Sequence, residues 1–222
     1  MQVLGKPLIV VFCLPGASFG GRFLECWTEL FAWCLKNGIK PVLSRKQSCN
    51  IYYVRNMCLG ADVMRGKNQK PFDGKLDYDY LMWIDSDIIF TPAQFGRLLS
   101  RDTDIVAGVY PMADGRSLAT VLDWDEEYFK QHGHFNFLTL QDIDGKEDLI
   151  QVSYTGMGFM LVKKGVFEKM EYPWFRPIEK QIGDAVDFTM EDAAFCLKAA
   201  EAGFRVFIDP TVRLGHEKKV VL

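Results

Sequence analysis

The chain opens with an apolar run, an amphipathic segment and a second apolar run, and this order restricts the folds that it can adopt. The first run extends from Leu8 to Leu14. After it, apolar residues recur at helical spacing, at positions 19, 23, 27, 30, 31 and 34, until Gly38 ends the segment. The second run, Ile39 to Leu43, has the length of a short strand. A strand, helix, strand unit favours a parallel sheet, so the sequence predicts an α/β fold.

The run from Tyr80 to Ile84 is apolar without alternation, which is typical of a central strand that is buried on both faces. Before it we expect a helix near residues 50–61 and a loop over 66–75. After it, Thr91 and Pro92 have the pattern of a helix start, and residues 104–108 that of a strand.

The second half of the chain predicts antiparallel strands added to the parallel ones. Residues 135–140 and 149–154 flank an Asp144-Gly145 turn, which indicates a hairpin. A helix from about Met190 to Ala202 ends at Gly203, and a strand over 204–208 and a basic tail follow. The expected fold class is a three-layer α/β/α arrangement around a mixed, mainly parallel central sheet, in one domain over residues 1–222.

Composition limits the classes of function. The 222 residues are 49% hydrophobic and carry a net charge of −3, so the chain offers no broad positive field for a nucleic acid. We expect no transmembrane segment, because the apolar run at residues 8–14 is far shorter than a bilayer requires; a secretory signal is the alternative interpretation of this run. The six cysteines contain no CxxC pair, which favours reduced thiols and a cytoplasmic location.

Asp85 and Asp87 follow the buried run at residues 80–84 directly. Two carboxylates at this spacing on extended backbone point the same way, and a hard divalent cation relieves their repulsion. The chain holds five Asp-x-Asp pairs, but only this one follows a buried strand, where ligands of open α/β sheets collect. The others, which begin at Asp77, Asp102, Asp123 and Asp142, are expected to be solvated or in turns.

The chain resembles the GT-A glycosyltransferases over most of its length, and its compactness is similar to that of small stand-alone members, including virus-encoded ones. Four segments carry the resemblance: residues 8–21, Tyr52-Tyr53-Val54-Arg55-Asn56, Trp83-Ile84-Asp85-Ser86-Asp87, and the run from Gly156-Met157-Gly158 through Glu191-Asp192 to His216. The resemblance implies transfer of a sugar from a nucleotide-diphosphate donor, with a UDP-sugar expected, to a hydroxyl acceptor. It also implies a donor half at about residues 1–110 and an acceptor half at about 111–222.

The resemblance assigns a metal site to Asp85, Asp87 and His216. In this family the last Asp of the motif, here Asp87, is the firmest metal ligand, Asp85 contacts the ribose or the metal, and a late His completes the site. The usual metal is Mn²⁺, which an imidazole ligand favours over the alternative, Mg²⁺. From the sequence alone, His216 could equally be a surface residue of the basic tail.

Asp192 is the expected catalytic base, because inverting members of this fold use an Asp of a Glu-Asp motif at a helix start. The alternative is structural: Thr189 with an acid three residues later resembles a capping box, and acids are favoured at helix starts. That position would also lower the basicity of the carboxylate, so whether Asp192 is a competent base depends on its burial, which the sequence does not show.

Further residues are expected around the donor and the acceptor. Pro15 and Gly16 lie at the carboxyl end of the first strand, Ser86 lies inside the motif, and Arg55 suits a phosphate or a base, with a surface arginine as the alternative. Four more residues are expected to contact the substrate sugars, the glycines by close backbone approach and the tryptophan by stacking: Gly156, Gly158, Trp174 and Glu191. A bulge or turn is an equal alternative for the glycines, and a core position is the alternative for the tryptophan. The histidines at 132 and 134 are expected to be solvated.

Two other classes fit parts of the sequence. A haloacid-dehalogenase-type phosphatase would use Asp85-Ser86-Asp87 and the later segment Gly183-Asp184-Ala185-Val186-Asp187, although its first motif normally lies on the first strand. A metal-dependent carbohydrate-binding module would need only acids and aromatic residues. Binding of a nucleotide with a metal separates the transferase from the binding module, and hydrolysis of a phosphate ester identifies the phosphatase.

Overall fold

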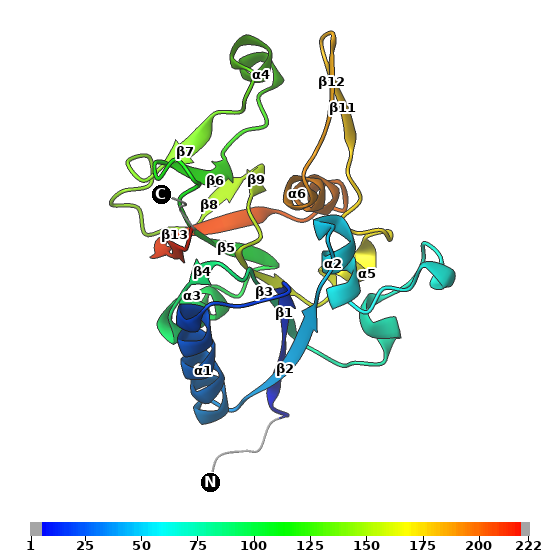
Figure 1. Ribbon diagram of the computed structural model, residues 1–222, viewed down its shortest axis with the longest axis vertical. Helices are drawn as coiled ribbons and strands as arrows, with labels where there is room; N and C mark the ends of the chain where they lie inside the picture. Colours follow the sequence, from blue (N-terminus) through cyan, green and yellow to red (C-terminus); the bar gives the residue numbers. More distant parts are fainter. Residues whose placement is uncertain (1–5, 219–222) are drawn as a thin grey trace.

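A computed structural model describes residues 6–218 and centres on a seven-stranded sheet of order β2-β1-β3-β10-β5-β13-β8 (Figure 1). The strands are β1 (Leu8–Pro15), β2 (Ile39–Lys46), β3 (Tyr80–Ile84), β5 (Ile105–Val109), β8 (Ile150–Val152), β10 (Phe159–Lys163) and β13 (Val206–Arg213). β10 runs antiparallel between β3 and β5, and β8 runs antiparallel to β13, whereas the other five strands share one direction. The predicted mixed, mainly parallel sheet is confirmed.

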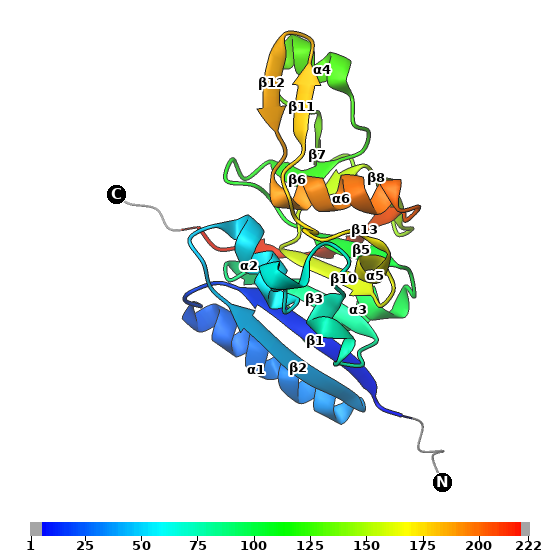
Figure 2. The ribbon, with the colours of Figure 1, turned by 90° about the vertical axis from the view of Figure 1, so that its right-hand side faces the viewer.

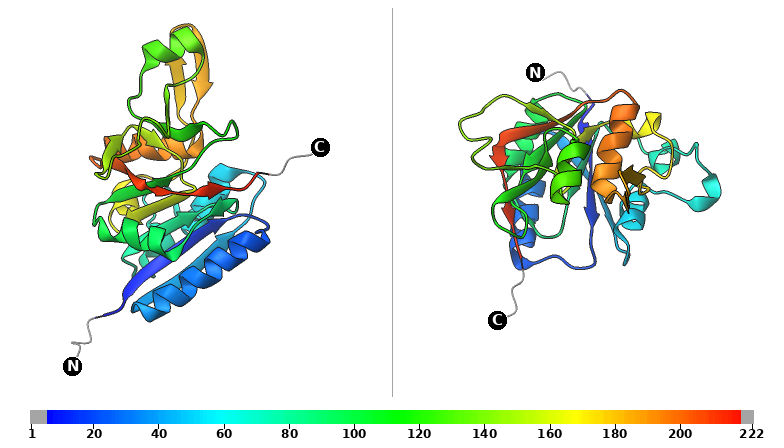
Figure 3. Two further views of the ribbon diagram at one scale, coloured as in Figure 1. Left: turned by 90° about the vertical axis from the view of Figure 1, so that its left-hand side faces the viewer. Right: turned by 90° about the horizontal axis from the view of Figure 1, so that it is seen from above.

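Helices cover both faces of this sheet, as Figure 1 and the view from above in Figure 3 show. One face carries α1 (Gly21–Lys36) and α3 (Pro92–Ser100), and the other carries α2 (Ile51–Cys58), α5 (Val166–Lys169) and α6 (Glu191–Glu201). Alternate residues of β1 serve the two faces: Phe12 packs in the core under α1 and α3, and Cys13 in the core under the other helices. The three-layer arrangement is confirmed.

Local chemistry places the helix starts near the predicted positions. The Asn50 side chain accepts hydrogen bonds from the backbone N–H groups of Tyr52 and Tyr53 and thus caps α2. Thr91 and Gln94 form a capping box at α3, with Pro92 as its first residue. The last predicted helix is α6, and the strand after it, β13, extends beyond the predicted residue 208 to Arg213.

The predicted hairpin around Asp144-Gly145 is wrong. β7 (Phe137–Thr139) and β9 (Tyr154–Thr155) both pair with β6 (Ser117–Val121), in a sheet of order β7-β6-β9, while β8 joins the central sheet. The intervening loop does not hold a hairpin turn between paired strands. Instead, Asp142 accepts a hydrogen bond from the Thr139 N–H, and Ile143 is fully buried in the core. The sequence of β6 shows no clear alternation of apolar and polar residues, so it did not indicate that β6, and not the other arm of the hairpin, pairs with these residues.

Two smaller pairs of strands complete the fold. The hairpin β11 (Glu179–Ile182) and β12 (Ala185–Phe188) and the helix α4 (Glu126–His132) project from the body (Figure 2). β4 (Ile88–Ile89) pairs with β14 (Gly215–His216) beside the carboxyl end of β3. Short helical turns occur at η1 (Val63–Arg65) and η2 (Pro71–Gly74). None of the helices in the described part is long and apolar enough to cross a membrane.

Candidate active site

The Asp85-Ser86-Asp87 segment is a turn at the carboxyl end of β3. The Ile88 N–H donates to the Asp85 carbonyl oxygen at 3.2 Å, so the backbone is not extended here and strand alternation does not align the two carboxylates. They bind different partners instead. Asp85 pairs with Arg55, and Asp87 contacts His216.

Pairing of β4 with β14 brings His216 to Asp87. His216 Nε2 lies 3.0 Å from Asp87 Oδ2, and His216 Nδ1 lies 2.7 Å from the carbonyl oxygen of Pro111. A carbonyl can only accept, so Nδ1 carries a hydrogen. Nε2 then either donates to Asp87 Oδ2 or, in the neutral imidazole, offers its lone pair to a cation that Asp87 also binds. The second is the arrangement in which a histidine binds a cation.

The residues present fit a cation that is held jointly with a ligand. Within residues 6–218, no three His, Cys, Asp or Glu side chains converge as a complete metal cage. Asp87 and His216 supply two ligand atoms, and Asp85 Oδ1 is buried without a hydrogen-bond partner. Lys218 also donates to Asp87 Oδ2, at 2.8 Å. Such a set suits Mn²⁺ or Mg²⁺ when diphosphate oxygens complete the coordination, as is usual for nucleotide-bound Mg²⁺.

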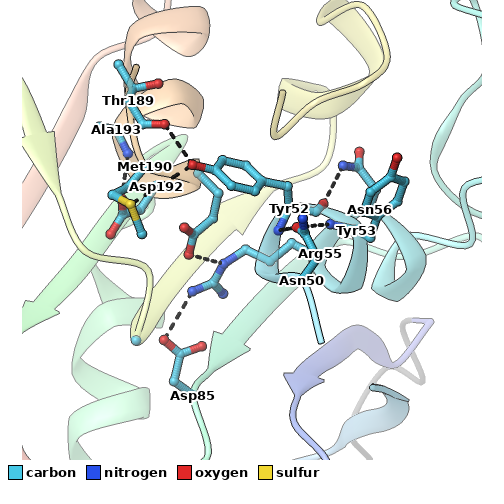
Figure 4. A network of polar contacts seen from close by, with 12 residues as sticks. Asn50, Tyr52, Tyr53, Arg55, Asn56, Asp85, Thr189, Met190, Asp192 and Ala193 are labelled. Atoms are coloured by element: carbon cyan, nitrogen blue, oxygen red, sulfur yellow. Dashed lines mark hydrogen bonds and ion pairs between the residues drawn. The ribbon is translucent and has the colours of Figure 1, made fainter. Parts of the chain in front are cut away.

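Arg55 is the centre of a buried network between β3, α2 and α6 (Figure 4). Its Nε donates to Glu191 Oε1 at 3.0 Å and its Nη2 to Asp85 Oδ2 at 3.1 Å. Only 2% of Arg55 is exposed, which excludes the surface arginine. Burial alone would lower the pKa of Arg55, but Asp85 and Glu191 raise it above its usual range, so the guanidinium stays charged. Nη1 is buried and has no hydrogen-bond partner among the described residues.

The capping-box interpretation of the α6 start is wrong. Met190 is the N-cap residue and makes no side-chain cap, and Thr189 Oγ1 accepts a hydrogen bond from the Ile178 N–H at 3.0 Å instead. Glu191 pairs with Arg55, so its carboxylate is committed to the protein network rather than free for a sugar.

Asp192 has the properties of a base that works near neutral pH. Burial and, next, the neighbouring Glu191 raise its pKa to about 7, against opposing effects of Arg55, the Ala193 amide and Tyr154. The Tyr154 hydroxyl donates to Asp192 Oδ2 at 3.2 Å. The helix start does lower this pKa, through the Ala193 amide, but burial, which the sequence could not show, outweighs it. Groups with pKa values near the working pH are the effective general bases.

Gly156 and Gly158 make room for Tyr110, and their expected approach to a sugar stays a prediction. A Cβ at Gly156 would lie 2.2 Å from the Tyr110 hydroxyl oxygen, and a Cβ at Gly158 2.8 Å from the ring. The Gly158 N–H donates to the same hydroxyl at 3.0 Å. The Tyr110 ring also packs edge-on against His216, with centroids 5.1 Å apart. Sequence reasoning missed Tyr110 and Tyr154; for Tyr110, its position directly after β5 was the available signal.

Replacing Gly156 by Ala is expected to destabilise the protein by about 1–3 kcal/mol, because the new methyl group overlaps the Tyr110 hydroxyl in a packed core. Thermal unfolding measures the change. Gly21→Ala is the matched control, since a Cβ there meets nothing within 4 Å. Equal unfolding temperatures for the two variants would show that Tyr110 does not occupy this space.

The remaining predicted residues divide into two groups. Gly16 lies against the motif, since a Cβ there would be 3.2 Å from Ser86 Cβ, and Pro15 is buried just before it at the end of β1. Trp174, in contrast, is 0% exposed, and its Nε1 donates to the Phe167 carbonyl oxygen at 3.1 Å. No face of Trp174 is free to stack on a sugar, so this prediction is wrong: the apolar ring is used by the core.

The phosphatase interpretation loses its second motif. Residues 183–187 lie on the projecting β11–β12 hairpin (Figure 1), and all four residues of β12 are exposed. Among residues 6–218, neither Asp184 nor Asp187 forms a hydrogen bond or ion pair with the Asp85–Asp87 turn. The two segments therefore do not form the joint site that a phosphatase of this class would need.

Comparisons with known proteins show the fold. No protein-family model matches this chain, and no curated protein sequence matches it. The crystal structure of A197 from STIV, a small viral protein, is similar with a TM-score of 0.51, 18% identity and coverage of 97% of this chain and 96% of that one. That of Drosophila β1,4-galactosyltransferase 7, as a mutant complexed with manganese, UDP-Gal and xylobiose, has a TM-score of 0.51, 10% identity and coverage of 96% and 71%. The chain therefore has a GT-A-like fold, as its motifs predicted.

Proposed function

We propose that the protein is a glycosyltransferase that moves a sugar from a nucleotide-diphosphate donor, a UDP-sugar in the first instance, to a hydroxyl acceptor. One observation carries the proposal: the turn after β3 places Asp87 against His216, and Asp85 against the network that leads to Asp192. The solved galactosyltransferase of the same fold binds manganese and UDP-Gal. We assign donor binding to about residues 1–110 and acceptor binding to about 111–222.

Each residue of the site has a separate role in the proposed reaction. When bound, a divalent cation stabilises the charge that grows on the departing diphosphate. Asp87 and His216 would hold it, and Arg55 keeps Asp85 in place with one buried guanidinium nitrogen left for the donor. Asp192 takes the proton of the acceptor hydroxyl. Direct attack by that hydroxyl on the anomeric carbon inverts the centre.

Thermal unfolding with UDP, GDP and CMP, each with and without Mn²⁺, tests the donor site. A ligand at 100 times its Kd adds about 2.7 kcal/mol, which corresponds to roughly 5–11 °C for a chain of this size. We expect a rise that requires both one nucleotide and Mn²⁺ and disappears in Asp87→Ala.

The matched control is Asp123→Ala, which alters an exposed Asp-x-Asp pair away from the site and is expected to keep the full rise. If no nucleotide raises the unfolding temperature of the unaltered protein, the transferase proposal fails and a metal-dependent carbohydrate-binding module replaces it. If Asp87→Ala keeps the rise, the donor site lies elsewhere.

A further inference from the structure

A cavity of about 600 Å³ lies beside the network, between α2 and the segment that leads into β11. Aromatic side chains line much of it, among them Tyr52, Tyr53, Tyr172 and Phe188. Tyr53 and Phe188 are 62% and 61% exposed, so their apolar faces are available to a ligand. Ligand sites commonly combine such apolar walls with a few polar groups that fix orientation.

Cationic side chains line this cavity and the one beside it: Arg176 lines both, whereas Lys169 and Lys198 line only the neighbouring one. The first cavity shares Tyr172, Pro173 and Arg176 with this neighbouring cavity, which has a volume of about 320 Å³. Lys198 Nζ donates to the Pro173 carbonyl oxygen at 2.6 Å, which fixes the amine there. The cavities thus form one continuous surface with an aromatic part and a basic part.

Arg176 and Lys198 are not held in ion pairs within the described part of the chain. Among residues 6–218, neither Arg176 nor Lys198 forms an ion pair with a carboxylate, although Glu171 and Glu201 line the smaller cavity. Glu171 pairs instead with Lys67, at 3.3 Å. Burial and, next, Arg176 lower the pKa of Lys198 to about 8, against a smaller opposing effect of the two carboxylates. Two neighbouring cations without partners favour an anion.

Tyr52 connects the cavity with the α6 start. Its ring lines the cavity, and its hydroxyl donates to the Thr189 carbonyl oxygen at 3.0 Å, two residues before Glu191 (Figure 4). Glu191 and Asp192 act on the Tyr52 hydroxyl electrostatically and, after burial, raise its pKa. A ligand in the cavity therefore lies next to the element that presents Asp192.

We propose that this cavity binds the acceptor, and that the acceptor is an anionic saccharide: a sugar ring lies against the aromatic walls and a phosphate or carboxylate group contacts Arg176 and Lys198. The proposal rests on the proposed transferase function. We assign the cavity to the acceptor rather than the donor because Gly16 and Ser86, which mark the donor side at the ends of β1 and β3, do not line it, whereas five of its ten lining residues come from the second half of the chain.

Saturation-transfer NMR with glucose, glucose 6-phosphate and glucuronate tests this, since the three probes share one ring. We expect at least one charged probe to bind at least tenfold more tightly than glucose, and the stronger of the two identifies phosphate or carboxylate. Arg176→Gln is expected to weaken charged probes roughly tenfold or more, as for loss of a charge-assisted hydrogen bond, and to leave glucose unchanged. Arg205→Gln, at an exposed arginine before β13, controls for net charge.

Two substitutions on β12, one at a lining residue and one as its control, test the aromatic wall of the cavity. Phe188→Ala is expected to weaken all three probes, whereas Val186→Ala, at a residue of the same strand that is 65% exposed and does not line the cavity, is expected to change nothing. Equal binding of glucose and the charged probes, no binding at all, or charged-probe binding that survives Arg176→Gln would each overturn the proposal. So would displacement of the probes by UDP, which would assign the cavity to the nucleotide.

The nucleotide-dependent rise in unfolding temperature is measured on the same variants and is expected to persist in Arg176→Gln and Phe188→Ala. If the rise is present in the unaltered protein but the sugar probes do not bind, only the acceptor assignment fails. If the rise itself is absent, the transferase function fails with it.

Discussion

Asp192→Asn is expected to abolish sugar transfer while leaving donor binding intact. An amide cannot take up the proton of the acceptor hydroxyl, and general bases contribute about 10²–10⁴-fold to rate. The Asn oxygen can still accept from the Ala193 N–H, and its NH₂ group can donate to the Tyr154 hydroxyl, which can also accept, so the change is local. Initial rates of transfer and the nucleotide-dependent rise in unfolding temperature separate the two effects. Transfer within about tenfold of the unaltered rate would exclude Asp192 as the base.

The same base predicts the pH dependence of transfer. Because burial and Glu191 raise its pKa to about 7, Asp192 is mostly protonated, and inactive as a base, below that pH. We expect kcat/KM to fall as the pH is lowered through about 7, by tenfold per pH unit on the acid side. A rate that stays constant down to pH 5 would mean that the base has an ordinary carboxylate pKa, or that no base limits the reaction.

Stability is expected to move in the opposite direction from activity. A carboxyl group whose pKa is higher in the folded than in the unfolded chain destabilises the fold once the pH exceeds the unfolded value, and the full penalty is present above about 7. Asp192→Asn removes that buried charge. At pH 8 its unfolding temperature should therefore not fall below that of the unaltered protein. A lower value would show that lost activity reflects damage to the fold.

The surroundings of the Asp85–Asp87 turn could be predicted because the local sequence pattern and the sheet topology agree there. The buried run of β3 stops directly before Asp85, and a run that is apolar on both faces is typical of a central strand. The carboxyl end of such a strand is where ligands collect, and the structure places Gly16 there as well. His216 joins it through one short strand pair, which no local pattern indicates; only the resemblance to GT-A enzymes suggested it.

Predictions failed where two parts of the chain compete for one partner. The expected hairpin had a good turn signal, but β6 offers pairing to both β7 and β9, and Ile143 is stabilised by burial within the intervening loop. The glycines at 156 and 158 have a purpose that depends on Tyr110, which lies far away in the sequence and close in space. Trp174 was mispredicted for a similar reason: the local sequence around an aromatic residue in a loop does not show whether its ring packs in the core or stacks on a sugar.

The Arg55 network is the feature on which both stability and the site depend. One guanidinium holds Glu191 at the start of α6 and Asp85 at the end of β3, and Trp83 packs under it with the guanidinium carbon 5.6 Å from the ring centroid. These elements belong to opposite halves of the chain. One side chain therefore bridges the motif turn and the helix that presents Asp192.

Arg55→Ala is expected to destabilise the protein by about 3–5 kcal/mol, because it leaves the buried Glu191 and the partly buried Asp85 without a counter-charge. For a chain of this size that is a fall of roughly 6–20 °C in unfolding temperature. Lys67→Ala also removes one positive charge, but from an exposed pair with Glu171, where about 1 kcal/mol or less is expected. If the two variants have equal unfolding temperatures, water reaches the carboxylates of Asp85 and Glu191, and the network is not shielded from solvent. If only Arg55→Ala lowers the unfolding temperature, Asp85 and Glu191 are shielded from water and depend on Arg55 for their counter-charge. The donor affinity of that variant should then also fall.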